Sequence, residues 1–223
     1  MEENLKLDKR FKFSVACDGG AASGKTTGAK IIAKKYGLNF LSSGSLYRYA
    51  GYRVLKDKPK NKINFLKKIF KNLKIKKLNK INLNTSKISD YTSLLAKDRR
   101  VRIILKKYQQ KFAKENTKPI IEGRDISTVI LPKADVKFFF KCSLDVAAKR
   151  RFKEFRKKKY KITFNEVKKA IKIRDYRDKN RAISPLIQAK DAVIVQSDKL
   201  NIFDMTNKMS KFIERKLKKK YGS

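Results

Sequence analysis

The segment from Gly19 to Thr26 constrains the fold of this 223-residue chain more than any other feature. It reads Gly-x-x-x-x-Gly-Lys-Thr and follows a β-prone run at 11–17. Apolar side chains then recur at helical spacing over 29–36, and Gly37 stands where a helix would end. A polyphosphate needs several backbone N–H groups directed into one concavity, and glycines allow both the turn and the close approach. The segment therefore predicts a nucleotide-binding loop between a strand and a helix, whose N-terminus adds partial positive charge.

Lys25 and Thr26 carry the chemistry of this loop. Lys25 can reach the β- and γ-phosphates of ATP, and the Thr26 hydroxyl can bind Mg²⁺. Thr27 follows directly, so either hydroxyl could serve the metal. By average residue frequencies, a chain of this length matches the pattern by chance about 1% of the time. The residues predicted to bind the nucleotide are Gly19, Gly20, Ala21, Ala22, Ser23, Gly24, Lys25, Thr26 and Thr27.

Segments typical of strands and of helices alternate along the rest of the chain. The run 136–142 is almost continuously apolar, as expected for a buried parallel strand. Ser143 can cap the helix that follows it, and Thr163 with Glu166 forms a capping box for another. Further strands are expected at 39–41, 119–122 and 192–196, and further helices at 90–113 and 202–217. This alternation predicts a three-layer α/β/α fold with a central parallel sheet.

The composition changes between about 56 and 96, where the chain is rich in Lys, Asn and Ser. One helical stripe within it consists of Ile63, Leu66, Phe70 and Leu73. Ile81, Leu83 and Ile88 are compatible with edge strands. We therefore expect a single domain over 1–223 with a subdomain inserted at about 56–96.

The net charge of +40, from 60 Lys+Arg against 20 Asp+Glu, raises nucleic-acid binding as an alternative. A face that handles many phosphates, or a general bias towards lysine, would also produce this charge. The lysines are spread along the chain with clusters at 56–80, 156–161 and 216–220, and no interleaved aromatic and basic motif is present. We expect no dedicated nucleic-acid partner.

The remaining composition excludes other classes. There is no histidine, and Cys17 and Cys142 are the only cysteines, which predicts buried free thiols and no zinc site. No apolar run approaches 18 residues, and residues 1–10 are polar and charged. We therefore expect no secretion signal, no membrane span and a cytoplasmic location.

Four motifs occur in order along the chain. They read Asp18-Gly-…-Ser23-Gly-Lys25, Leu41-…-Ser43-Gly44-x-x-Tyr47-Arg48, Glu122-Gly-Arg124-Asp125-Ile-…-Thr128-Val, and Arg174-Asp-x-Arg177-Asp178-x-Asn180-Arg181. Together they resemble the cytidylate kinase family over nearly the whole chain. The resemblance implies a P-loop NTPase fold with an NMP-binding insertion and a small lid at about 154–181. It implies Mg²⁺-dependent transfer of the ATP γ-phosphoryl group to CMP or dCMP, giving CDP or dCDP and ADP, by a monomer.

The same resemblance implies roles for individual residues. Those expected to bind the CMP phosphate are Ser43, Arg48, Arg124 and Arg181. Those expected to read the cytosine edge are Ser93, Arg102 and Asp125, and Asp178 would contact the sugar hydroxyls. Arg174 and Arg177, in the lid, would close over the ATP phosphates. The residues expected to act in catalysis are Lys25, Arg124, Arg174, Arg177 and Arg181.

Arginines suit such a reaction on chemical grounds. The acceptor phosphate is already an anion, so transfer requires positioning and charge neutralisation more than a general base. A guanidinium pairs bidentately with phosphate oxygens. If the helix opened by Thr163 continues, Arg174, Arg177 and Arg181 recur at spacings of three and four and share one face. On spacing alone, a solvated charged helix is the favoured interpretation, and the family resemblance reverses that preference.

The chain also departs from the family pattern. Glu122 stands where an aspartate is usual, and Gly20 replaces a usual proline. Asp98 to Arg100 lies where a proline is usual, and 56–96 fits the insertion poorly. These departures bear more on base selectivity than on phosphoryl transfer. Two alternatives stay open: a small P-loop kinase for UMP, AMP or a small metabolite, and an RNA-associated nucleotide-binding protein.

Overall fold

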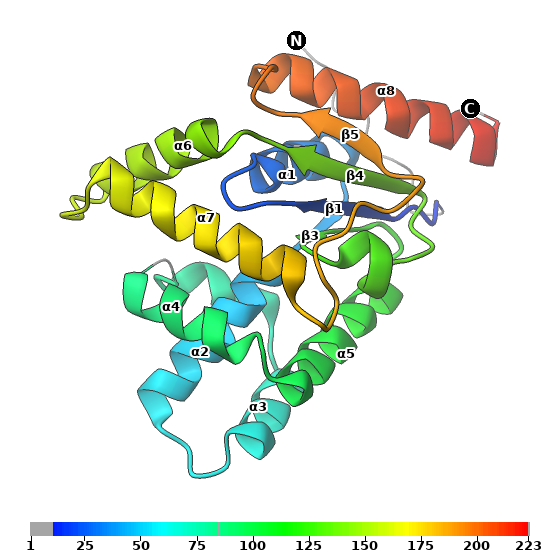
Figure 1. The fold of residues 1–223 in the computed structure, drawn as a ribbon. Helices are drawn as coiled ribbons and strands as arrows, with labels where there is room; N and C mark the ends of the chain where they lie inside the picture. Colours follow the sequence, from blue (N-terminus) through cyan, green and yellow to red (C-terminus); the bar gives the residue numbers. More distant parts are fainter. Residues whose placement is uncertain (1–10, 84, 223) are drawn as a thin grey trace. The chain divides into compact units, whose positions relative to one another are not determined.

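Five strands form one sheet in the order β2-β3-β1-β4-β5 in the computed structural model, which describes residues 11–83 and 85–222 (Figure 1). The strands are β1 Val15–Gly19, β2 Asn39–Ser42, β3 Pro119–Gly123, β4 Val136–Lys141 and β5 Val193–Gln196. β1 pairs in parallel with β3 and β4, and β4 pairs in parallel with β5. The predicted parallel sheet is confirmed. The polar segment 1–10 lies outside the described residues.

The first strand ends later than the apolar run at 11–17 indicated. Asp18 and Gly19 continue the pairing with β4, opposite Phe139 and Phe140. The strand therefore carries the chain directly into the glycine-rich loop, and Asp18 is a buried residue of the sheet.

The structure divides into two compact units, which are described separately. The sheet unit comprises the chain up to Phe40 and from Thr117 onwards, and the helical unit comprises Leu41–Asn116. The chain passes from one to the other within β2. The helical unit extends further in both directions than the insertion expected at about 56–96.

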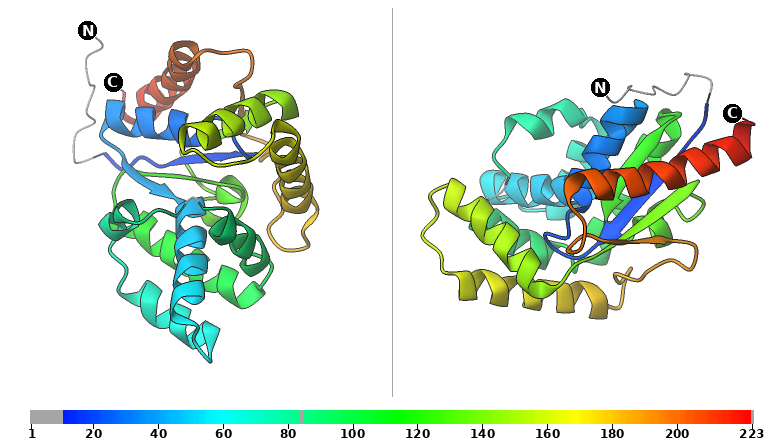
Figure 2. Two further views of the ribbon diagram at one scale, coloured as in Figure 1. Left: turned by 90° about the vertical axis from the view of Figure 1, so that its left-hand side faces the viewer. Right: turned by 90° about the horizontal axis from the view of Figure 1, so that it is seen from above.

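The core of the sheet unit lies between the sheet and two helices. These are α1, Lys25–Tyr36, and α8, Ile202–Tyr221, which lie together in both views of Figure 2. Ile32 of α1, Met209 of α8 and Phe140 of β4 are buried in one apolar cluster. Gly37 ends α1 in the left-handed conformation, as predicted. This packing holds the loop before α1 against the carboxyl end of β1.

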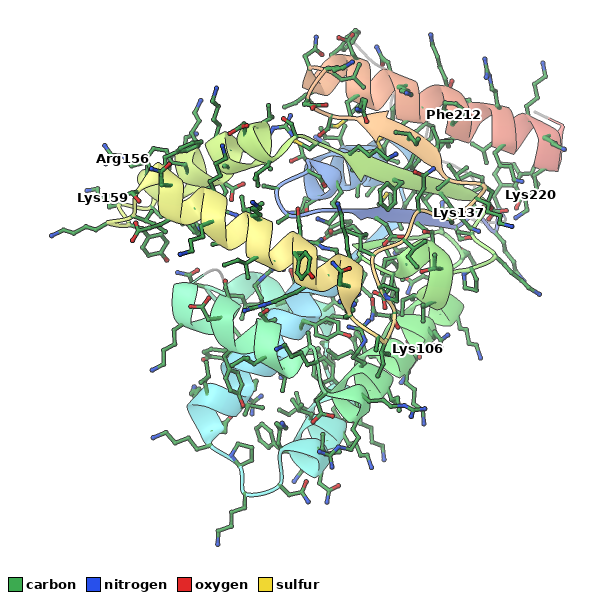
Figure 3. The ribbon with its side chains drawn as sticks, in the orientation of Figure 1. Lys106, Lys137, Arg156, Lys159, Phe212 and Lys220 are labelled. Carbon is green, nitrogen blue, oxygen red and sulfur yellow. The ribbon has the colours of Figure 1, made fainter. Side chains whose placement is uncertain are left out.

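Two more helices of the sheet unit run side by side, α6 at Leu144–Lys157 and α7 at Phe164–Asn180 (Figures 1 and 2). Ser143 caps α6 and Thr163 forms the capping box with Glu166, so both predicted helix starts are confirmed. Arg156 and Lys159 lie at the turn between the two helices, distant from Lys220 at the end of α8 (Figure 3). A short π-helical turn, Ile126–Ile130, follows β3.

The helical unit consists of α2 Ser43–Asp57, α3 Lys62–Lys71, the 3₁₀ turn Ile75–Lys80, α4 Ser86–Leu95 and α5 Arg99–Glu115. Its core includes Phe70, whose ring packs edge-on against Tyr49 and Tyr108. The edge strands proposed around Ile81, Leu83 and Ile88 are wrong. Residues 81–83 form no strand, and Ile88 lies in α4, whose first turn is capped by the Thr85 hydroxyl.

The single helix expected at 90–113 is also wrong, because the chain forms α4 and α5 instead. The Asp98 carboxylate accepts a hydrogen bond from the Arg100 N–H at 2.9 Å and caps α5. A residue that caps a new helix has non-helical backbone, so the apolar periodicity continues across a break. Over 11–83 and 85–222, no helix combines the length and the apolar character that crossing a membrane requires.

Candidate active site

The glycine-rich loop, residues 20–24, leaves β1 and enters α1. Gly19 has φ 154° and Gly24 φ 83°, and Ala22 between them has φ 51°. Glycine adopts these conformations at no steric cost, whereas an alanine at φ > 0 is strained. Lys25, the first residue of α1, is 7% exposed and its Nζ donates to the Gly20 carbonyl at 2.9 Å. The loop therefore closes around the ammonium group of Lys25.

A serine and an arginine hold this loop from the side of β5. The Ser197 hydroxyl donates to the Ser23 carbonyl at 2.7 Å, and Arg150 of α6 donates to the Ser197 hydroxyl at 3.0 Å and carbonyl at 2.6 Å. No pattern in the sequence singled out either residue. Arg150 is one cation in a basic helix, and Ser197 lies 174 residues from its partner Ser23.

The buried Asp18 carboxylate links β1 to the segment after β3. It accepts hydrogen bonds from the Ile126 N–H at 2.8 Å, the Ser127 N–H at 2.7 Å and the Ser127 hydroxyl at 2.5 Å. Burial raises the pKa of Asp18, and these three bonds oppose the rise only in part. Arg124 and Asp125 immediately precede this anchored segment. The contact therefore ties the predicted acceptor-binding residues to the strand that carries the phosphate loop.

Replacing Asp18 tests this link. Asp18→Ala leaves two buried backbone N–H groups without an acceptor and is expected to cost about 2–4 kcal/mol of unfolding free energy. Asp18→Asn keeps one acceptor oxygen and is expected to cost less. Ser127→Ala removes only the hydroxyl contact and is expected to cost about 1 kcal/mol. Urea unfolding measures all three, and equal stability of Asp18→Ala and the wild type would contradict the anchoring role.

Arg124, Asp178 and Arg181 come together in the sheet unit. Arg124 Nε donates to Asp178 Oδ2 at 2.8 Å, and Arg181 lies 3.3 Å from Asp178 Oδ1 and 3.9 Å from Asp125 Oδ1. Arg181 Nε also donates to the Ser184 carbonyl at 2.7 Å. The Arg124 and Asp178 side chains are only 14% and 17% exposed. Four of the predicted substrate-binding residues therefore form one charged cluster.

The charges of this cluster stabilise one another. Burial opposes ionisation of Asp178, but the surrounding Arg124, Arg174 and Arg181 outweigh it and lower its pKa. Burial likewise opposes the charge of Arg124, but the Asp178 and Asp175 carboxylates outweigh it and raise the Arg124 pKa. Arg124 and Asp178 are therefore both held ionised, the state in which they form charge-assisted hydrogen bonds.

The arginines of α7 differ in their surroundings. Arg174 is half-buried, and its positive charge lowers the pKa of both Lys25 and Asp178. Arg177 is exposed. The structure thus brings Arg174 and Arg181 to the cluster, whereas Arg177 faces solvent.

The other predicted acceptor contacts lie in the helical unit. Ser43 is the buried first residue of α2, and Arg48 Nη2 donates to the Ser45 hydroxyl at 3.1 Å over the start of the same helix. Arg102 of α5 donates to the Ala96 carbonyl at 3.4 Å, and its guanidinium lies 5.8 Å from the centre of the Tyr47 ring. Ser93 is half-buried on α4.

The residues of the loop fit a magnesium ion bound together with a nucleotide. The Thr26 and Thr27 side chains are both exposed in the first turn of α1. Glu122 is a buried carboxylate, 3% exposed, at the end of β3 and pairs in register with Cys17 of β1. Within the described ranges no group of three or more acidic, cysteine or histidine side chains could hold a metal alone. Mg²⁺ keeps several waters and takes phosphate oxygens, so it needs no such group.

Comparison with known proteins places the chain in a family. The model of the cytidylate kinase family matches residues 15–215. The cytidylate kinase of Thermosipho melanesiensis is 37% identical over 214 residues, covering 92% of this chain and 98% of that protein. The cytidylate kinase of Fusobacterium nucleatum is 38% identical over 216 residues, covering 90% and 97%. The crystal structure of an uncharacterized protein from Eubacterium ventriosum has the same fold, with a TM-score of 0.55, 15% identity and coverage of 91% and 98%. The chain belongs to the cytidylate kinase family.

Proposed function

We propose that this protein transfers the γ-phosphoryl group of ATP to CMP and dCMP, giving ADP and CDP or dCDP. The observation that carries the proposal is the charged cluster of Arg124, Asp125, Asp178 and Arg181 in the unit that also holds the complete phosphate loop. A phosphate loop alone serves many nucleotide-binding proteins. An arginine cluster beside it supplies a second anion site, which a kinase with a phosphate acceptor requires.

The chemistry of transfer follows from these charges. The acceptor phosphate is already ionised, so the protein must hold two anions in line and neutralise charge on the transferring group. Lys25 and the N–H groups of the loop bind the donor phosphates, and Arg124 and Arg181 bind the acceptor phosphate. Arg174, which acts electrostatically on both Lys25 and Asp178, closes over the ATP phosphates. Arg177 joins the phosphates when α7 closes as part of the lid, about 154–181.

Individual side chains recognise the base, the sugar and the phosphate of the acceptor. Asp125 accepts a hydrogen bond from the exocyclic amine that distinguishes cytosine from uracil, and Asp178 contacts the sugar hydroxyls. Ser93 and Arg102 also contact the cytosine base. Ser43 and Arg48 bind the phosphate of the acceptor nucleotide. We further propose that the enzyme is a cytoplasmic monomer.

Thr26 would hold Mg²⁺, and Glu122 would act on it through water. The ion would neutralise charge on the donor phosphates when it is bound. Thr26 presents its exposed hydroxyl at the start of α1. Glu122 places a buried carboxylate near the C-terminal end of β3, the strand that pairs with β1.

Lys25 makes ATP binding depend on pH. Burial, with the nearby positive charges of Arg124 and Arg174, lowers the Lys25 pKa to about 7 in the nucleotide-free protein. Bound phosphates favour the charged ammonium and raise this pKa. Binding of MgATP is therefore expected to take up a proton, to an extent that grows from about pH 6 to about pH 8, and affinity should fall above about pH 7. Titration calorimetry in buffers of different ionisation enthalpy measures the uptake. The same uptake in Lys25→Met would contradict this assignment.

The activity itself is tested by ADP release with ATP, Mg²⁺ and a panel of CMP, dCMP, UMP, AMP and shikimate. CMP and dCMP are expected to stimulate turnover most strongly. A preference for another acceptor would indicate a related small kinase. If no acceptor stimulates turnover the kinase proposal fails, and RNA titration at increasing salt would test whether the +40 charge serves a nucleic acid.

A further inference from the structure

The Asp175 side chain of α7 contacts the phosphate loop directly. Its Oδ1 accepts a hydrogen bond from the Ala21 N–H at 2.8 Å, between residues 154 positions apart in the chain. Asp175 lies beside Arg174 and three positions before Asp178, both of which belong to the charged environment of the site. The contact therefore joins the helix of the arginines to the loop that would hold ATP.

The other side of Ala21 is also held by α7. The Ala21 methyl group is buried in an apolar cluster with Val167 and Ile171 of α7 and with Ala147 and Ala148 of α6. Ile171 and Asp175 are four residues apart and lie on the same helix face. This face of α7 thus presents an apolar contact and a hydrogen-bond acceptor to one residue of the loop.

Gly20 makes room for the carboxylate. A Cβ added at Gly20 would lie 2.7 Å from Asp175 Oδ2 and 3.3 Å from its Cγ, so the carboxylate would have to move to admit a side chain there. Gly20 is not among the glycines with positive φ, so its backbone does not itself require glycine. Because Gly20 has no side chain, the space next to it is free for the Asp175 carboxylate.

The Asp175 charge also acts on two cations of the site. It favours the charged form of both Lys25 and Arg124. A carboxylate beside a phosphate loop would repel a nucleotide, but the positive charges of Lys25 and Arg124 near Asp175 oppose this repulsion.

From these contacts we propose that Asp175 is a positioning residue, which docks α7 on the phosphate loop and so sets Arg174 relative to the phosphates of bound ATP. The proposal rests on the kinase function above. It assigns to Asp175 and Gly20 a common role, since one supplies the carboxylate and the other the space that it occupies. Asp175 need not touch either substrate to do so.

Two variants disturb the same contact from opposite sides. Asp175→Ala removes the acceptor, and Gly20→Ala displaces the carboxylate while keeping its charge. Because a misplacement of about 1 Å can cost about 10²-fold in rate, each is expected to lower kcat with CMP by about 10- to 100-fold. The KM for CMP should change by less than about 3-fold, since neither residue is proposed to bind CMP. Asp175→Asn, which keeps an acceptor oxygen, should recover part of the lost kcat.

The double variant Asp175→Ala/Gly20→Ala decides whether the two residues act together. Its kcat should be close to that of either single variant, because each already removes the same contact. If the kcat of the double variant falls by the product of the two single losses, the proposal is overturned. A lower KM for ATP with an unchanged kcat would overturn it as well, because the carboxylate would then be a competitor of the nucleotide.

Asp145→Ala is the matched control. Asp145 is an exposed acid of α6 that pairs with Lys168 of α7, so the variant removes a charge next to α7 without altering the loop. Its kcat should equal that of the wild type. Exchange of the Ala21 amide in the nucleotide-free protein gives a readout independent of activity, and it should be faster in Asp175→Ala. Unchanged exchange would overturn the proposal, whereas an inactive wild type would instead refute the proposed function.

Discussion

Arg124→Ala is expected to lower kcat with CMP by about 10³-fold, the loss that removal of an arginine from a phosphoryl-transfer site typically causes. Arg124 is the most enclosed arginine of the cluster and pairs with Asp178 at 2.8 Å. Its loss would remove the bidentate partner that we propose for the acceptor phosphate, and it would leave the half-buried Asp178 carboxylate with weaker compensation. Steady-state kinetics at saturating ATP, with kcat and the KM for CMP determined separately, measure the effect.

Arg124→Lys separates geometry from charge. An ammonium keeps the charge but cannot form two parallel hydrogen bonds, so this variant should recover only a minor part of the lost rate. Asp125→Ala is the companion variant, because it should reduce the preference for CMP over UMP while retaining more of the transfer rate. Full activity of Arg124→Lys would show that Arg124 acts only through its charge. A kcat of Arg124→Ala within about 3-fold of the wild type would refute its place in the site.

Gly19→Ala is expected to destabilise the folded protein by about 3–5 kcal/mol, through backbone strain together with overpacking. Gly19 has φ 154°, which residues with a side chain rarely adopt. A Cβ there would lie 2.6 Å from the Phe140 carbonyl oxygen and 2.8 Å from Phe140 Cβ. Both belong to the paired strand β4, so the obstacle cannot rotate away. Urea unfolding of the purified variant measures the loss.

Gly222→Ala is the control for Gly19→Ala. Gly222 also has positive φ, at 71°, but a Cβ there would meet no atom within 4 Å. Gly222→Ala therefore isolates the penalty for placing a side chain on a residue with positive φ, which should lower the unfolding free energy by about 1 kcal/mol. If the two substitutions cost the same, the close approach of β4 to Gly19 is not what requires glycine.

Local patterns predicted much of the secondary structure around the site. The phosphate loop needs glycine, lysine and threonine at set spacings, so its residues are adjacent in sequence as well as in space. Capping works in the same way: Ser143 and Thr163 accept hydrogen bonds from residues three positions further on. Continuous apolar runs such as 136–142 identify strands buried on both faces. These features were predictable because the interacting groups lie within one turn or one strand.

The helical unit was predicted less well, for a related reason. Alternating apolar residues at Ile81 and Leu83 fit a strand, but they form none in this unit. The apolar stripe at 90–113 has one periodicity across two helices, and the break depends on the side chain of Asp98 capping α5. Periodicity reports which residues face a core, and it does not report where the backbone changes direction.

The sequence by itself therefore determined the βα alternation, the phosphate loop and, through four ordered motifs, the family. Only the tertiary structure decided that Asp18 anchors the segment after Arg124 and Asp125, 108 residues away, and that Asp175 reaches Ala21 across 154 residues. Both aspartates stand within the motifs, yet neither had an evident partner. A carboxylate takes its function from the donors around it, and in these two cases the fold brings donors from distant segments to a buried or half-buried position.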